Sequence, residues 1–136
     1  MRFLNSKSPM IAAKLIPWFV PTETESRAQI ASELAQRLEQ KPDETLCLVA
    51  IERNITRAIV IAHVSEKYRK TVWAWQARAE PGFRYSEIMF DALKGWTKAK
   101  GCRRIRTAVT DERVAKLHER KYGFNRDGQE MYCNVA

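Results

Sequence analysis

The fold is decided by residues 71–124, TVWAWQARAEPGFRYSEIMFDALKGWTKAKGCRRIRTAVTDERVAKLHERKYGF. The pattern predicts a strand, a short turn, an amphipathic helix, a second strand, a second helix and a Gly-Phe ending. A strand that feeds a turn at a helix N-terminus suits an anionic phosphate, because the first amides of a helix are unpaired and the helix dipole is positive there. The turn at 81–85 is therefore a candidate phosphate site.

The N-terminal part of the chain carries the clearest helical pattern. A helix is predicted over 22–40, with Thr22 and Glu25 spaced as a capping box. Residues 8–20 are ambiguous, because two prolines interrupt an otherwise helical face.

The remaining elements complete a single domain over residues 1–136. Strands over 45–53, 58–64 and 71–80 form an antiparallel meander whose first turn is Arg53-Asn54. Later elements are a helix over 86–100, a strand over 105–109, a helix over 111–121 and a strand over 129–135. This order predicts an α+β fold (a three-layer α/β arrangement), with a mixed, mostly antiparallel sheet flanked by helices.

Composition narrows the class of protein. Apolar residues make up 45% and charged residues 29% of the chain, which is typical of a globular domain. No apolar run reaches the roughly 20 residues that span a bilayer, so no membrane partner is expected. The three cysteines are far apart and lack metal-ligand spacing. We expect reduced, buried thiols, no metal and a cytoplasmic location.

The positive charge lies in the second half. Residues 1–66 hold eight Lys/Arg and eight Asp/Glu, whereas residues 67–136 hold sixteen and eight, so the second half carries the net charge of +8. Such a half favours an anionic partner or is a solvated face. Coenzyme A and nucleic acid are two such partners. The cations that suggest nucleic acid are Arg103, Arg104, Arg106, Arg113, Lys116, Arg120 and Lys121.

The order and spacing over residues 45–135 resemble the acyl-CoA-binding half of the GCN5-related N-acetyltransferases (GNATs). The phosphate loop of that family is Gln/Arg-x-x-Gly-x-Gly/Ala, and here it falls on residues 81–86, PGFRYS. Arg84 and Ser86 stand where the family has its two signature glycines. Either the Arg84 guanidinium binds phosphate directly and Ser86 caps the helix, or the site is eroded on an inherited scaffold.

A second motif lies on the helix over 111–121. Family members often show Asn-x-x-Ala-x-x-Leu-Tyr followed shortly by Gly-Phe. Here Asp111 takes the Asn position and serves as N-cap, and His118 takes the place of the Tyr that often protonates the departing thiolate. Tyr122 is a rival donor, and a structural or solvent-facing His118 is the alternative. His63, inside an apolar strand, is expected in the core.

The strand over 71–80 would pair its backbone with the pantetheine arm. Alternation places Trp73, Trp75 and Ala77 on one face and Val72, Ala74, Gln76 and Arg78 on the other. The two tryptophans are expected to fill the core, with an acceptor pocket as the alternative. Gln76 and Arg78 are expected to have polar partners, because long polar side chains on a half-buried strand need them.

The resemblance implies an acyl-CoA-dependent N-acyltransferase, with acetyl-CoA or another acyl-CoA as co-substrate and direct attack by an amine in a ternary complex. Glu80 would be the base, with a solvated turn carboxylate as its alternative reading, and His118 or Tyr122 would be the acid. The implied cofactor-binding residues are Gln76, Ala77, Arg78, Gly82, Phe83, Arg84, Tyr85, Ser86 and Asp111. The basic surface favours a neutral or acidic acceptor.

Other functions are left open by the sequence. A catalytically inactive GNAT-fold protein could act as a binding or assembly module, including a phage-associated one. Nucleic-acid binding is the weakest alternative, because no recognised motif accompanies the cations. Self-association as a homodimer is also left open.

Overall fold

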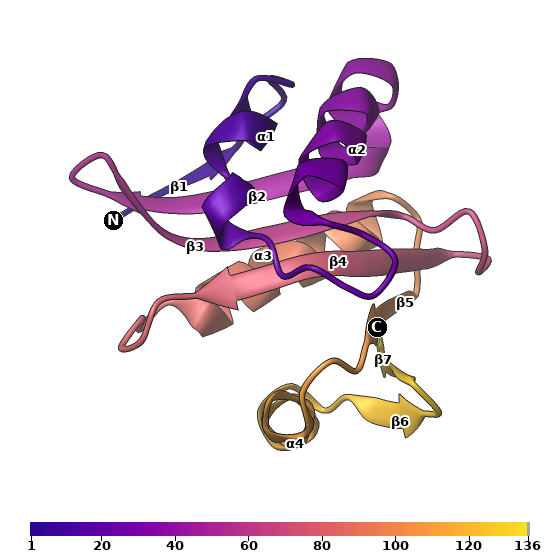
Figure 1. Cartoon of the computed structure of the whole chain (residues 1–136). Helices are drawn as coiled ribbons and strands as arrows, with labels where there is room; N and C mark the ends of the chain where they lie inside the picture. Colours follow the sequence, from indigo (N-terminus) through magenta and orange to yellow (C-terminus); the bar gives the residue numbers. More distant parts are fainter. Residues whose placement is uncertain (136) are drawn as a thin grey trace.

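The computed structural model describes residues 1–135 and contains one sheet of seven strands (Figure 1). The strands are β1 Arg2–Asn5, β2 Thr45–Glu52, β3 Ile55–Val64, β4 Thr71–Ala79, β5 Arg104–Ala108, β6 Asn125–Asp127 and β7 Glu130–Asn134. The helices are α1 Ile11–Lys14, α2 Arg27–Gln40, α3 Ser86–Ala99 and α4 Glu112–Tyr122, with 3-10 turns at Ile16–Trp18 and Pro42–Glu44.

The strand order is β1-β2-β3-β4-β5-β7-β6, and β4 with β5 is the parallel pair in an otherwise antiparallel sheet. The predicted α+β class and the meander of β2, β3 and β4 are confirmed. The turn between β2 and β3 has positive φ at Arg53 (52°) and Asn54 (65°), as a two-residue hairpin requires. The sequence signal therefore identified this turn correctly.

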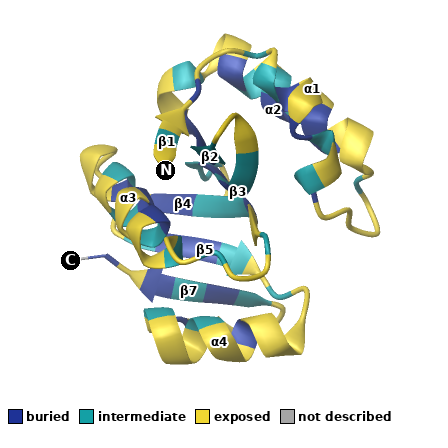
Figure 2. Ribbon diagram, turned by 90° about the vertical axis from the view of Figure 1, so that its left-hand side faces the viewer, coloured by how far each residue is buried: buried dark blue, intermediate teal, exposed yellow. Residues whose placement is uncertain are grey.

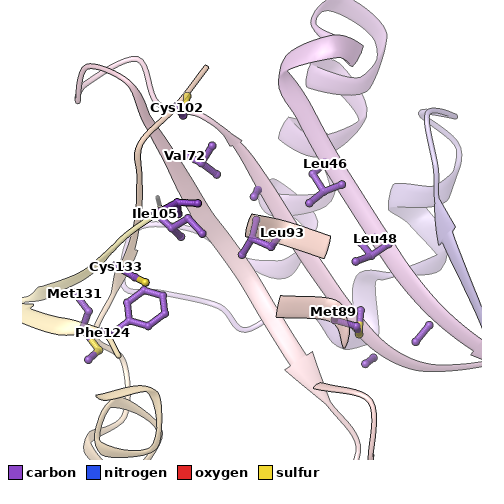
Figure 3. Close-up of a cluster of buried hydrophobic side chains, with 14 of the residues drawn as sticks. Leu46, Leu48, Val72, Met89, Leu93, Cys102, Ile105, Phe124, Met131 and Cys133 are labelled. Atoms are coloured by element: carbon purple, nitrogen blue, oxygen red, sulfur yellow. The ribbon is translucent and has the colours of Figure 1, made fainter. Parts of the chain in front are cut away.

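Two hydrophobic clusters lie on opposite faces of the sheet. Figure 2 shows α1 and α2 on one side of the strands and α3 on the other. The first face buries Phe19, Ile30 and Leu34 against β2 and β3. The second face, drawn in Figure 3, packs Met89 and Leu93 of α3 and the C-terminal strands onto the sheet. The result is the predicted three-layer arrangement.

Helix α2 begins later than predicted. Its cap is Ser26, whose hydroxyl accepts the Gln29 amide while the Gln29 side chain accepts the Ser26 amide. The Thr22 hydroxyl instead accepts the Glu25 amide at 3.0 Å in a separate turn. Both pairs fit the capping-box spacing, but Ser26 lies one turn before the first buried residue of the helix, Ile30. The start predicted at Thr22 is therefore wrong.

The structure adds a strand that the sequence did not predict and moves the cap of α3. Strand β6 was not anticipated, because its three residues are all exposed and give no apolar alternation. Helix α3 begins at Ser86, so the cap position falls on Tyr85, which makes no side-chain capping bond. Ser86 is therefore not the cap of α3, and the first amides of this helix have no side-chain acceptor.

A β-bulge in β4 overturns the predicted faces. Ile61 of β3 pairs with Gln76 while Ala62 pairs with Ala74, so Trp75 is an extra residue. Residues beyond a bulge exchange faces relative to simple alternation. Gln76 and Arg78 consequently share the α1–α2 face with both tryptophans, whereas Ala77 lies across from Val60 on the α3 face.

The position of the α2 cap can be tested by comparing Ser26→Ala with Thr22→Ala. Ser26→Ala removes a capping box and should lower the free energy of unfolding by about 1 kcal/mol. Thr22→Ala lies outside the helix and should change it by less than about 0.5 kcal/mol. Urea denaturation of both variants measures the difference. A larger loss for Thr22→Ala would contradict a helix that begins at Arg27.

Candidate active site

The central feature of the site is the divergence of β4 from β5. Their register contains three pairs, from Thr71 opposite Arg104 to Trp73 opposite Arg106. Past this point β5 stays paired with β7 alone, and just beyond its end the Val109 amide donates to the Gln129 carbonyl at 2.8 Å. Within residues 1–135, the edge of β4 from Ala74 to Ala79 therefore has no strand partner on this side.

A cleft of about 450 Å³ opens at the divergence. On one side lie the connection before α2 and α2 itself, and on the other lie the end of β5 and the start of α4. The lining residues are Val20, Thr22, Thr24, Glu25, Glu33, His63, Trp73, Trp75, Gln76, Ala77, Thr107, Ala108, Val109, Thr110, Asp111, Val114, Ala115, His118 and Met131. The cleft thus joins segments far apart in the sequence.

Thr107 bridges the two strands where the ladder stops. Its hydroxyl donates to the Ala74 carbonyl at 2.9 Å, so this carbonyl remains satisfied after the backbone pairing ends. The arrangement fixes where the cleft begins and leaves β4 extended beyond it. An extended strand edge with free amides can accept a peptide-like ligand as an added strand.

Known proteins of this shape were found among solved structures. A GNAT-family protein from Desulfovibrio desulfuricans matches with a TM-score of 0.77 at 13% identity, covering 99% of each chain. The PaiA N-acetyltransferase of Thermoplasma acidophilum, solved in complex with coenzyme A, matches at 0.68 and 16%, covering 98% of this chain and 99% of that one. YncA from Salmonella typhimurium, solved with its cofactor acetyl-CoA, matches at 0.74 and 10%, covering 100% and 94%.

The chain has the GNAT fold. No protein-family model matches the sequence, and no curated protein does so either. At such low identities the likeness establishes the arrangement of elements. The roles of individual residues in this GNAT fold have to be argued from its own contacts.

Gln76 and Arg78 have the polar partners expected of them. The Gln76 amide accepts the Val20 amide at 2.8 Å and donates to the Val20 carbonyl at 3.2 Å. Arg78 donates to the Pro17 carbonyl at 3.3 Å, and its guanidinium lies over the Trp18 ring. Both side chains therefore fasten the connection before α2 onto β4. If Gln76 and Arg78 bind the cofactor as predicted, they would do so through the backbone groups of β4, since their side chains are already engaged.

Asp111 and His118 lie in the cleft on the α4 side. Asp111 is the N-cap of α4, as predicted, and its carboxylate accepts the Arg113 amide at 2.8 Å. His118 is half-buried against the Tyr122 and Phe124 rings. Burial lowers the pKa of His118, so its neutral imidazole predominates at pH 7. An imidazolium acid at this position is therefore disfavoured, although the ring N–H remains a donor.

Glu80 and Tyr122 lie outside the cleft lining. The Glu80 carboxylate accepts two hydrogen bonds from Arg57 Nη1, at 2.8 and 3.1 Å. Tyr122 is the last residue of α4 and packs on Phe90, with ring centroids 4.4 Å apart. Neither contact points to catalysis, so both catalytic roles remain predictions.

The loop between β4 and α3 holds the residues predicted to bind phosphate. Gly82 has a positive φ of 82°, in a turn closed by the Phe83 amide and the Glu80 carbonyl at 3.2 Å. Phe83 and Tyr85 pack edge-to-face and anchor the loop. Arg84 is exposed and makes no hydrogen bond or ion pair within residues 1–135. Its guanidinium is therefore available to an anion.

Three residues of the cleft were not selected from the sequence. His63, expected in the core, is only half-buried and packs edge-to-face on Trp75 at the cleft wall. Glu25 and Glu33 reach the cleft from the turn before α2 and from α2. Trp73 and Trp75 also line it, so the expectation of two core tryptophans is wrong in part. These residues come from the turn before α2, from α2 and from β3, and only the fold brings them together.

Residues 1–135 contain no group of three or more His, Cys, Asp or Glu side chains arranged to hold a metal ion. No helix in the same part of the chain is both long and apolar enough to cross a bilayer. All three cysteines are buried and free, as expected, and burial raises the pKa of Cys47 to about 12.

The two histidines predict a pH dependence of stability. Burial is the main cause that lowers the pKa of both His63 and His118 in the folded chain. When the pH falls through about 6.5, the unfolded chain takes up protons that the folded chain does not. The free energy of unfolding should therefore decrease until the pH reaches the folded pKa values.

Urea denaturation at pH 7.5 and 5.5 measures this loss, and the double variant His63→Gln/His118→Gln should show less of it. The comparison is needed because the raised pKa of Glu25 acts in the opposite direction. Imidazole signals that titrate above pH 6.5 in NMR spectra would contradict the expected direction.

Proposed function

We propose that the chain is an acyl-CoA-dependent N-acyltransferase that moves an acetyl group from acetyl-CoA to an amine. The supporting observation is the cleft at the divergence of β4 and β5, where an unpaired strand edge borders a cavity. PaiA and YncA, which share the fold, were solved with coenzyme A and acetyl-CoA, which supports an acyl-CoA as donor.

The free edge of β4 would hold the acyl donor. Its amides can pair with the amides of the pantetheine arm and polarise the thioester carbonyl. The loop at 81–85 follows the same strand and leads into the uncapped N-terminus of α3. The pyrophosphate would therefore lie beside these helix amides and the Arg84 guanidinium.

Acyl transfer then needs an amine on the other side of the thioester. The amine nitrogen bonds to the acyl carbon, the carbon–sulfur bond breaks, and the thiolate takes up a proton. His118 lies in the cleft and its neutral ring N–H can donate toward the departing sulfur. We retain His118 as the candidate acid ahead of Tyr122, because Tyr122 does not line the cleft.

A catalytically inactive assembly module is the second candidate. One observation favours it: Arg84 and Ser86 replace the two glycines whose bare backbone would close around a pyrophosphate. This candidate predicts that coenzyme A does not bind. Calorimetric titration with acetyl-CoA and with coenzyme A separates the two functions.

Arg84→Ala tests the proposed function directly. Acetyl-CoA should bind the unaltered protein, and the variant should weaken binding at least about tenfold, because a charge-assisted hydrogen bond to phosphate contributes about 1.5–3 kcal/mol. The effect should fall at higher salt concentration, since the site is exposed.

Arg103→Ala is the matched control, because it removes the same charge at the opposite end of β4, beside Lys70. Equal losses in the two variants would indicate general electrostatic attraction. Absence of heat with millimolar acetyl-CoA and with coenzyme A would refute the enzyme and leave the assembly module.

A further inference from the structure

The charge of the cleft is opposite to that of the molecule. The chain has 24 Lys/Arg against 16 Asp/Glu, yet no Lys or Arg of the described residues lines the cleft. The charged side chains that do line it are the carboxylates of Glu25, Glu33 and Asp111. The cleft therefore carries negative charge in a chain whose net charge is +8.

Two of these carboxylates act together. Glu25 and Glu33 line the same cleft, and both are half-buried. Burial raises the pKa of Glu25, and the neighbouring Glu33 adds to the effect. Two adjacent carboxylates in partly desolvated surroundings repel each other, and a cation between them relieves the repulsion. Asp111 differs, because its carboxylate already caps α4.

The nearby cations compensate this charge only in part. Arg37 Nε lies 3.5 Å from Glu33, but the same guanidinium also contacts Glu66 at 3.4 Å, and Lys41 contacts Glu66 at 3.2 Å. Arg37 is thus shared between Glu33 and Glu66, and within residues 1–135 Glu25 makes no ion pair. His63 adds no positive charge at pH 7, because burial lowers its pKa.

Aromatic rings complete the same wall. Trp73 and Trp75 line the cleft together with Glu25. The His63 ring packs edge-to-face on Trp75, with centroids 6.0 Å apart. Tryptophan faces attract ammonium groups, and the attraction increases where water is excluded.

We propose that the acceptor of this cleft is a small compound with two ammonium groups, one held by the Glu25–Glu33 pair and the tryptophans. The identification of the substrate class rests on the proposed function, since it places the acceptor opposite the thioester. It reverses the neutral or acidic acceptor expected from the surface charge. The cleft, with its aromatic wall, is the binding site, and the carboxylates set its charge.

The proton balance is consistent with such an acceptor. The reacting ammonium loses one proton to become a nucleophile and a second when the amide forms. One of these protons ends on the sulfur of coenzyme A and the other leaves to solvent. Glu25 lies in the same cleft and can take the first proton, as a general base would.

Three probes of equal length test the proposal: 1,4-diaminobutane, 4-amino-1-butanol and 4-aminobutanoate. Binding is followed without coenzyme A, through the indole N–H signal of Trp75 in NMR titrations, assigned with Trp75→Phe. We expect 1,4-diaminobutane to bind at least tenfold more tightly than 4-aminobutanoate, with 4-amino-1-butanol between them. Equal binding of the three, a preference for 4-aminobutanoate or no shift of the signal would overturn the proposal.

Glu25→Gln and Glu33→Gln should each reduce the preference for 1,4-diaminobutane at least fivefold. Glu23→Gln is the matched control, because Glu23 is exposed in the same segment and does not line the cleft. Unchanged preference in both cleft variants, or an equal loss in the control, would refute the role of the carboxylate pair.

The same probes with acetyl-CoA report on the proposed function separately. Release of free thiol, with mass spectrometric detection of the N-acetyl product, should follow the order of binding. A protein that binds 1,4-diaminobutane selectively but does not bind acetyl-CoA would refute the acyltransferase and uphold the cationic ligand. Preferential acetylation of 4-aminobutanoate would uphold the acyltransferase and refute the cationic ligand.

Discussion

The structure depends on the short parallel pairing of β4 and β5. Three residue pairs hold the two halves of the sheet together, and the Thr107 hydroxyl satisfies the Ala74 carbonyl where they end. A longer pairing would leave no free strand edge and no cleft. A shorter one would expose Val72 and Ile105, both fully buried in the core. The position of the divergence is therefore set jointly by the core and by the site.

The bulge at Trp75 is the second constraint. It is the reason why Gln76 and Arg78 reach the segment before α2 while both tryptophans still face the cleft. Without the extra residue, Gln76 would lie toward α3, and the Val20 backbone would lose its two hydrogen bonds. Bulges commonly occur beside active sites because they redirect a side chain without ending the strand. Here one bulge builds the wall and also holds the connection that covers it.

Most elements could be predicted because their signals are local. The hairpin turn at Arg53-Asn54 and the N-cap Asp111 are examples in which neighbouring residues determine the conformation. The bulge at Trp75 could not be predicted, because it depends on the register between β4 and β3, and no glycine marks it in the sequence. Glu25, Glu33 and His63 were missed for a related reason, since three separate elements bring them together. Two residue pairs, Thr22 with Glu25 and Ser26 with Gln29, have the spacing of a capping box. The position of Ile30, the first buried residue of α2, favours Ser26 as the cap.

The cations of the second half explain how a basic chain can keep an acidic cleft. Arg106, counted from the sequence among the cations for nucleic acid, is buried and donates to Asp127 at 2.6 Å and Glu130 at 2.9 Å. Arg126 is paired with Glu112 and Glu119. Arg106 and Arg126 thus form ion pairs within the C-terminal strands and between these strands and α4. Within residues 1–135, Arg84, beyond the end of β4, is free of such pairing, so anionic and cationic ligands would be attracted to different ends of one strand edge. In the proposed acyl transfer, this separation of charge would orient the two substrates before either meets the other, because each is repelled from the end that suits its partner.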